Sequence, residues 1–279
     1  VQTEEPTGAT VLLNLTESDI QNEGGWPFPR DRLAKIHIDL LNAGAASVSW
    51  VAVFSEPDRF GGDAAFAEAL SYHPSVIAMF ETEGYRDIPK TEGTVILGDS
   101  VSGIEATGVT QNIPILRSVA LQGIVSAPVD VDNLVRRMPL LMRSPDGWMA
   151  SFGTQLLKAV TGTNTYVIKT NANGIEEVRV KQLNPIPTDT FGRIWVNWIA
   201  PHETSLDKMD VEGKMVIVGT TAKGILPQVS TPKGLLYPHQ IQASFVETML
   251  HASNKPMPRI PQASLLYEML NFVFGVLLV

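Results

Sequence analysis

Short apolar segments and longer amphipathic segments alternate along the first 80 residues of the chain. Three of the short segments are almost unbroken apolar runs, as in strands that are covered on both faces: 11–15, 48–54 and 75–80. Between the first two, Leu33, Ile36 and Leu40 recur at helical spacing and predict a helix. We expect a second helix over 64–70, capped by Asp63. This order predicts a parallel sheet with right-handed crossovers.

The segment 213–224 is the clearest strand candidate, and a small polar turn follows it. Residues 215–218 form a short apolar run, although such a run alone does not distinguish a buried strand from a buried helix. We interpret Gly219 and Gly224 as the residues that let the chain turn sharply. Because open parallel sheets bind ligands at the carboxyl ends of their strands, we expect a ligand site at this turn.

The middle of the chain is richer in strands. Strands are predicted at 95–97, 119–126 and 134–142, the last two antiparallel around a turn at 128–133. A helix over Phe152, Leu156, Leu157 and Val160 is expected to end at Gly162, and a hairpin is expected to turn at 171–174. A strand at 192–199 and a helix over Ile241, Phe245, Met249 and Leu250 complete the predicted elements. The predicted fold class is therefore α/β. A mixed, mainly parallel central sheet is flanked by helices and carries a β-rich insertion.

The two ends of the chain suggest a membrane protein. After Asn271 the sequence is wholly apolar, and since a spanning helix needs about 20 apolar residues, 265–279 is interpreted as the start of a transmembrane helix. A buried core helix is the alternative. The proline-rich stretch 256–264 is interpreted as a stiff linker, which leaves 1–255 as the globular domain. Val1 is not a methionine and no targeting segment follows it, so we expect a further segment upstream.

Composition excludes several classes of function. The chain has 21 Lys and Arg against 29 Asp and Glu, a net charge of −8, so it lacks the cationic character with which proteins bind nucleic acids. It has no cysteine, which excludes disulfides, thiolate metal sites and cysteine catalysis. With 279 residues, 44% of them hydrophobic, it can bury the core of one large domain or of two closely packed ones.

Few residues have a spacing that indicates chemistry. Glu56, Asp58 and Asp63 could bind a hard cation, but they lack the EF-hand spacing, and the preference of Asp for caps and turns explains them more simply. The histidines lack zinc-site spacing and no nucleophile elbow is present, so neither a metal, a cofactor nor a catalytic group is predicted. Arg136 and Arg137 are expected on opposite faces of one strand, which would prevent them from forming one patch.

Short segments spread over residues 26–250 occur here in a characteristic order. They are Trp26-Pro-Phe-Pro-Arg30, Ala43-Gly-Ala45, Phe54-Ser-Glu-Pro-Asp58 with Gly62-Asp63, Arg136-Arg-Met-Pro-Leu-Leu141, Val196-Asn197, and Val218-Gly-Thr-Thr-Ala-Lys-Gly224 with Thr231-Pro232. Together they resemble the type 2 CHASE domain, a sensory module associated with cyclases and histidine kinases. The chain departs from that family at Val51 and at Pro227-Gln228, where the family usually has acidic residues.

The resemblance implies a sensory domain on the extracytoplasmic, periplasmic side of a bacterial cell membrane. Its output would come from a cyclase or histidine kinase domain beyond this sequence. We expect a small-molecule ligand, a homodimer or a subunit of a membrane complex, and contact with the membrane through the C-terminal helix and an upstream helix. The candidate ligand-binding residues are Glu56, Asp58, Asp63, Asn197, Thr220, Thr221 and Lys223.

A second hypothesis belongs to a different class. The chain would be a non-catalytic accessory or scaffold subunit that docks on a larger membrane protein complex. The apolar and neutral residues at Val51 and Pro227-Gln228 favour this hypothesis, because a ligand contact that depends on charge would be lost there.

Overall fold

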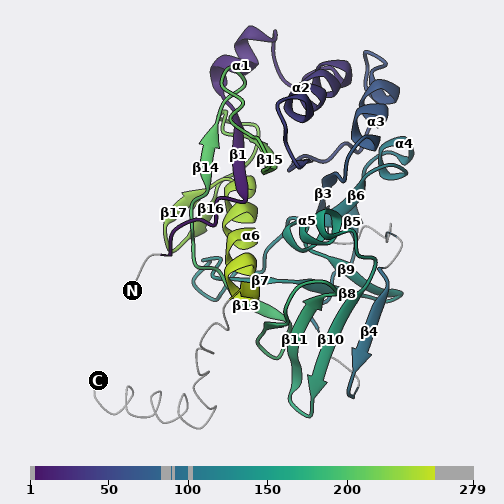
Figure 1. Cartoon of the computed structure of the whole chain (residues 1–279), viewed down its shortest axis with the longest axis vertical. Helices are drawn as coiled ribbons and strands as arrows, with labels where there is room; N and C mark the ends of the chain where they lie inside the picture. Colours follow the sequence, from purple (N-terminus) through teal and green to yellow (C-terminus); the bar gives the residue numbers. More distant parts are fainter. Residues whose placement is uncertain (1–3, 83–88, 90–91, 100–102, 255–279) are drawn as a thin grey trace.

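The protein has an α/β fold in which one large sheet lies between two sets of helices, and a strand-rich part extends from one end (Figure 1). The computed structural model describes residues 4–82, 89, 92–99 and 103–254. The predicted linker and transmembrane start, 256–264 and 265–279, lie outside the described residues. Within the described part of the chain, no helix has the length and apolar character needed to cross a membrane.

The large sheet is mainly parallel. Its order is β14-β1-β15-β2-β3, and both β6 and the antiparallel β5 pair with β3. The strands are β1 (Thr10–Leu15), β2 (Ser47–Trp50), β3 (Val76–Glu81), β5 (Val109–Thr110), β6 (Leu121–Ile124), β14 (His202–Thr204) and β15 (Met215–Thr220). The predicted parallel sheet is confirmed. So is the buried strand at 215–218, which is central, between β1 and β2.

Helices cover both faces of this sheet. They are α1 (Glu17–Asn22), α2 (Arg30–Asn42), α3 (Asp63–Ser71), α4 (Pro114–Arg117), α5 (Phe152–Thr161) and α6 (Pro238–Asn254). Successive strand residues point to opposite faces, and the core divides accordingly. Val11 and Leu13 pack with Leu33 of α2, whereas Leu12 packs in the cluster that contains Phe245 of α6.

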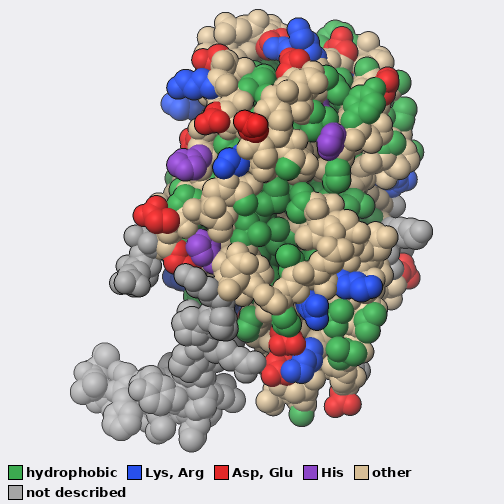
Figure 2. All heavy atoms as spheres, viewed as in Figure 1, with side chains coloured by type: hydrophobic (Ala, Val, Ile, Leu, Met, Phe, Trp, Pro, Cys, Tyr) green, Lys and Arg blue, Asp and Glu red, His purple; other side chains and the backbone are tan. Residues whose placement is uncertain are grey.

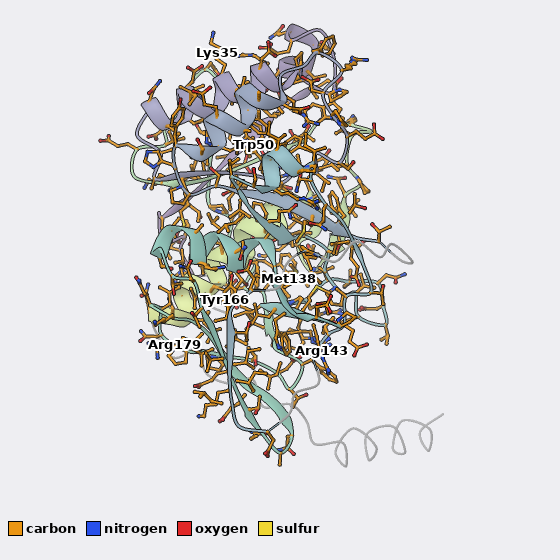
Figure 3. All side chains as sticks on the ribbon, turned by 90° about the vertical axis from the view of Figure 1, so that its right-hand side faces the viewer. Lys35, Trp50, Met138, Arg143, Tyr166 and Arg179 are labelled. Carbon is orange, nitrogen blue, oxygen red and sulfur yellow. The ribbon has the colours of Figure 1, made fainter. Side chains whose placement is uncertain are left out.

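The strand-rich part consists of smaller sheets. One of them consists of β4 (Thr94–Leu97), β10 (Tyr166–Asn171), β11 (Gly174–Val180) and β12 (Ile186–Pro187). In addition, β7 (Arg137–Pro139) pairs with β13 (Arg193–Trp195), and β8 (Leu141–Ser144) pairs with β9 (Gly147–Ala150). The two-stranded sheet of β16 (Val229–Thr231) and β17 (Gly234–Leu236) lies apart from these, on the left in Figure 1. The hairpin predicted at 171–174 is confirmed. Figure 3 shows Tyr166 and Met138 in this part, apart from Trp50 under the helices of the other end.

The predicted antiparallel pair of 119–126 and 134–142 is wrong. β6 runs parallel to β3 instead, and residues 134–142 contain β7 and the start of β8, which pair with β13 and β9. Gly123 places β6 directly under α5, because a Cβ on it would lie 2.4 Å from the Phe152 Cα. Both segments have the apolar pattern of a strand, and that pattern does not specify the partner.

Other predicted elements differ only in extent. β2 ends at Trp50 and β13 spans three residues, so the predicted strands 48–54 and 192–199 were too long. α5 ends at Gly162 as predicted, with a φ of 63°, but Val160 is 36% exposed rather than packed with Leu156 and Leu157.

Figure 2 shows apolar side chains in the middle of one face of the molecule and charged side chains around them.

Candidate functional site

The loop after β2 is tied to the first turn of α2 by Arg30. Its guanidinium group donates to Asp63 Oδ1 and to the carbonyl oxygen of Glu56, each at 3.1 Å. Asp58 in the same loop also binds the start of α2, since its Oδ2 accepts from the backbone N–H of Arg30 at 2.9 Å, and it accepts from the N–H of Gly62 at 3.1 Å. Because this loop follows a parallel strand, the group lies at the carboxyl edge of the large sheet. Three predicted residues, Glu56, Asp58 and Asp63, are therefore brought together.

The charges of Arg30, Asp58 and Asp63 are paired with one another or with backbone N–H groups, whereas Glu56 contributes only its carbonyl oxygen and has an exposed side chain. Burial raises the pKa of Asp58, but N–H donors from Arg30, Phe60 and Gly62 outweigh burial and hold that pKa below its usual value. Burial lowers the pKa of Arg30, against the attraction of Asp63 and Asp58. Within the described ranges, no cluster of acidic and histidine side chains is arranged to hold a metal ion. The geometry is that of a brace between a loop and a helix.

The predicted capping role of Asp63 is wrong. Gly62 is the N-cap of α3 and makes no side-chain cap, while Asp63 is the first helical residue. Its carboxylate is drawn away from the free helix N–H groups, because Oδ2 accepts from the N–H of Asp58 at 2.9 Å and Oδ1 binds Arg30.

Thr220 and Thr221 fasten the end of β15 to the end of β1. Thr220 Oγ1 and the Thr221 N–H both donate to the carbonyl oxygen of Leu15, at 3.0 Å each. Lys223 is exposed in the turn that follows, before Gly224 with its φ of 81°. These residues lie at the same edge of the sheet as the Arg30 brace, at the end of a neighbouring strand.

Gly219 was predicted to let the chain turn sharply after the strand, and this prediction is wrong. It lies inside β15, and a Cβ built on it would be 2.2 Å from the Cγ of His239. His239, in the first turn of α6, is fully buried, with Nε2 2.8 Å from Asn14 Oδ1. Burial lowers the pKa of His239 to about 4, so the ring is neutral at pH 7. A glycine is required here because α6 approaches the strand so closely.

Asn197 is not brought together with the other six candidates. Its N–H donates to Thr248 Oγ1 at 3.1 Å, and its Nδ2 donates to Glu4 Oε2 at 2.8 Å. Thr248 belongs to the second half of α6, whereas His239 at the start of that helix touches the carboxyl edge. Asn197 therefore lies at the far end of α6, beside the first described residues of the chain.

Glu247 fastens the first described segment to α6, and sequence reasoning missed it. Its carboxylate is fully buried and accepts from the Thr7 N–H at 2.7 Å, from Thr7 Oγ1 at 3.1 Å and from Thr10 Oγ1. One turn further, His251 Nε2 lies 2.9 Å from the carbonyl oxygen of Glu5. The segment that leads into β1 and the last described helix are thus bound together. The sequence signal that could have identified Glu247 is a carboxylate within the apolar pattern of this helix.

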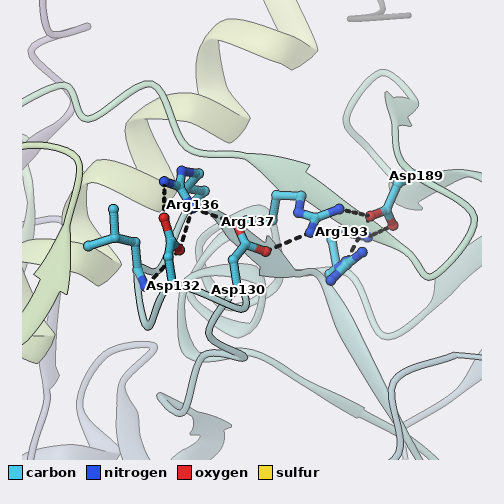
Figure 4. A network of polar contacts seen from close by, with 7 residues as sticks. Asp130, Asp132, Arg136, Arg137, Asp189 and Arg193 are labelled. Atoms are coloured by element: carbon cyan, nitrogen blue, oxygen red, sulfur yellow. Dashed lines mark hydrogen bonds and ion pairs between the residues drawn. The ribbon is translucent and has the colours of Figure 1, made fainter. Parts of the chain in front are cut away.

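Charged side chains form an alternating chain of ion pairs across the strand-rich part (Figure 4). Asp130 binds both Arg136 Nη1 at 3.2 Å and Arg137 Nη2 at 2.6 Å, and the Arg137 guanidinium in particular holds the pKa of Asp130 below its usual value. Arg137 also lies 3.5 Å from Asp189, to which Arg193 Nε donates at 2.7 Å. The prediction that Arg136 and Arg137 cannot act together is wrong, because β7 begins only at the second of them.

Replacing Arg137 by leucine is expected to lower the free energy of unfolding by about 2 kcal/mol, because two carboxylates lose a shared partner. The Asp189 side chain is only 4% exposed, so solvent cannot replace the lost charge. Urea unfolding of the full chain measures the change. Asp132→Asn removes an exposed partner of Arg136 and serves as the control with a much smaller effect. Equal effects of the two substitutions would show that the Arg137 pairs stabilise the fold no more than the exposed pair of Arg136 with Asp132 does.

The fold and these contacts define an α/β domain in which the segment that enters β1 is bound to α6, the last described helix. The model of the CHASE2 domain family matches residues 1–279, and the chain belongs to that family. CHASE2 domains are extracellular sensory domains of signalling proteins, and they are not catalytic. No curated protein and no solved structure matched the chain.

Proposed function

We propose that this chain is the extracytoplasmic sensory domain of a membrane-anchored receptor of the cyclase or histidine kinase type. In this proposal it binds a small ligand and relays the bound state through the segment that follows α6. The observation that carries the proposal is the course of α6. Its first turn presses on Gly219 in the central strand, and Glu247 near its other end holds the segment that leads into the domain.

Relay requires two arrangements of the domain that differ in ligand affinity. α6 is suited to such a change because it contacts both central strands β1 and β15 as well as α5. A shift of its first turn by a change at the sheet would move Thr248 and His251 together with it. Both segments that connect the domain to the membrane would then be displaced, since Thr7 and Glu5 are bound to the same helix.

Weakening the junction at Glu247, where α6 meets the entering segment and the first residue of β1, is expected to change the output of the full-length receptor. Thr10→Val removes one of the donors to Glu247 without removing volume. We expect cyclase or autokinase activity in native membranes to change about fivefold at equal amounts of folded receptor, as for a typical coupling energy. Glu17→Gln, an exposed change on α1, is the control.

Two results would contradict the proposed function. One is output identical to wild type in Thr10→Val at equal folded protein. The other is a full-length protein without an output domain that migrates with one large membrane complex on native gels, which would favour the accessory subunit instead.

A further inference from the structure

The strand β4 forms an exposed, apolar edge of the strand-rich part. It lies at the margin of that part in Figure 1, and β10 is its one neighbour among the described strands. Val95, Ile96 and Leu97 are 47%, 43% and 53% exposed. Because strand residues alternate between the two faces of a sheet, Val95 and Leu97 lie on one face and Ile96 on the other. Apolar side chains therefore reach solvent on both faces of this edge.

The backbone of β4 directs hydrogen-bonding groups away from its sheet. The carbonyl oxygen of Gly93 accepts from the Tyr166 N–H at 2.9 Å, so the peptide groups of alternate residues, starting at Gly93, point to β10. Residues between them direct their N–H and C=O groups to the opposite side. Thr94 and Ile96 consequently point these groups to the outer edge. An edge of this kind is a template on which another strand can pair.

The edge lacks the features that normally prevent pairing with another chain. Natural proteins protect edge strands with charged side chains, with proline or with a bulge. Positions 94–98 contain neither a charged residue nor a proline, and the pairing of β4 with β10 continues without a register shift. An apolar edge without such protection indicates a surface that another strand covers.

The sequence of β4 is complementary to itself. When two copies pair antiparallel about a two-fold axis at Ile96, Ile96 faces its own copy and Val95 faces Leu97. Moving the axis by one residue would place Leu97 opposite Gly93, or Val95 opposite the charged Asp99. The axis at Ile96 also pairs its outward N–H and C=O groups with those of the copy, as in a hydrogen-bonded antiparallel pair.

We propose that β4 pairs in this way with β4 of a second copy of the chain, so that two four-stranded sheets join into one continuous sheet. Four paired residues cover less than the roughly 800 Å² per partner of a standard interface, so the pair is weak in dilute solution. Anchoring in one membrane raises the effective concentration to the order of millimolar and favours pairing. The inference rests on the proposed function for this anchor.

The paired edge is connected to the helix that the relay uses. Glu92, just before β4, is bound by Lys158 and by Gln155 Nε2 at 2.7 Å, and both belong to α5. Gly153 of α5 lies against α6, since a Cβ on it would be 2.8 Å from the Phe245 ring. A change in the pairing at β4 would therefore reach α6 through α5, and the second copy is a partner that can bias the relay.

Disulfide cross-linking tests the pairing, because the chain has no cysteine of its own. Paired Ile96 residues would have Cα atoms about 5.5 Å apart, within the range of about 4.4–6.8 Å that a disulfide spans. We expect Ile96→Cys in the full-length receptor, oxidised mildly in native membranes, to give at least about fivefold more covalent dimer than Leu235→Cys. Leu235 is the matched control, since it is apolar, 60% exposed and on a different strand, β17.

A mixture of two variants tests the register. Val95→Cys and Leu97→Cys expressed together are expected to cross-link more strongly than either alone, because only the mixture places two cysteines directly opposite each other, at about 4.5 Å between Cα atoms. The mixture also decides the matter if Ile96→Cys lowers the amount of folded protein.

Three results would overturn the inference: no dimer of Ile96→Cys above the wild-type background, equal cross-linking at positions 96 and 235, or a mixture that cross-links no better than its single components. The proposed function fails separately. Unchanged output of Thr10→Val contradicts the relay, whereas the cross-link is measured without any output.

Discussion

Replacing Gly219 by alanine is expected to destabilise the domain by about 3 kcal/mol or more, as for severe overpacking of a core. The new Cβ would lie 2.2 Å from the Cγ and 2.5 Å from the Cβ of His239, far inside contact distance. Neither side can yield easily. Gly219 is paired with Asn14 in the central strand, and His239 is held by its hydrogen bond to the same Asn14.

Urea unfolding of Gly219→Ala and Gly224→Ala separates this close approach from ordinary glycine effects. Gly224 has a φ of 81° and nothing within 4 Å of a built Cβ, so alanine there costs only backbone strain, about 1–2 kcal/mol. His239→Gly removes both the Cγ and the Cβ that the methyl group would meet, so the double substitution at 219 and 239 is expected to cost less than the sum of the single ones. Additive effects, or equal effects at 219 and 224, would refute the steric account.

The first 80 residues could be interpreted correctly because their information is local. Helical and strand periodicities specify β1, α2, β2, α3 and β3, and such an order almost always folds into a parallel sheet. The pairing of 119–142 could not be predicted, because it depends on Gly123 passing under Phe152 of a helix that has its own independent pattern. Strand pairing is a tertiary property that neither segment contains by itself.

The difference between local sequence patterns and tertiary contacts also explains which polar clusters could be predicted. Glu56, Asp58 and Asp63 are close in sequence and at one strand end, so their grouping could be predicted, although Arg30 turns them into a brace. The buried ion pair of Glu92 with Lys158 could not be predicted, because the two residues are 66 residues apart and no motif spacing connects them. Their meeting depends on the packing of α5 against the strand-rich part.

Two buried histidines are expected to make the domain sensitive to acid. His37 is fully buried in α2, where its Nδ1 accepts from Trp50 Nε1 at 3.1 Å, and burial, with a smaller effect of His73, lowers its pKa to about 4. Burial lowers the pKa of His239 to the same value. Both rings are neutral in the folded protein above this pH.

The direction of the effect follows from the difference between the folded and unfolded pKa values. In the unfolded chain these histidines titrate near their ordinary value of about 6.5, so below it the unfolded state binds more protons than the folded state. Stability is therefore complete above about pH 6.5 and falls as the pH is lowered toward about 4. Each histidine is expected to contribute roughly 3 kcal/mol to this loss over the whole window.

Single glutamine substitutions isolate this contribution from the carboxylates that titrate in the same range. Glutamine cannot be protonated, and it can still accept from Trp50 at position 37 or donate to Asn14 at position 239. The loss of unfolding free energy between pH 7.5 and 4.5 should be smaller than in wild type by roughly 2–3 kcal/mol in His37→Gln and in His239→Gln. His202→Gln, on the exposed edge strand β14, should retain the full loss. A pH dependence unchanged in both buried variants would mean that the rings are already solvated in the folded protein, because only a buried neutral ring resists protonation.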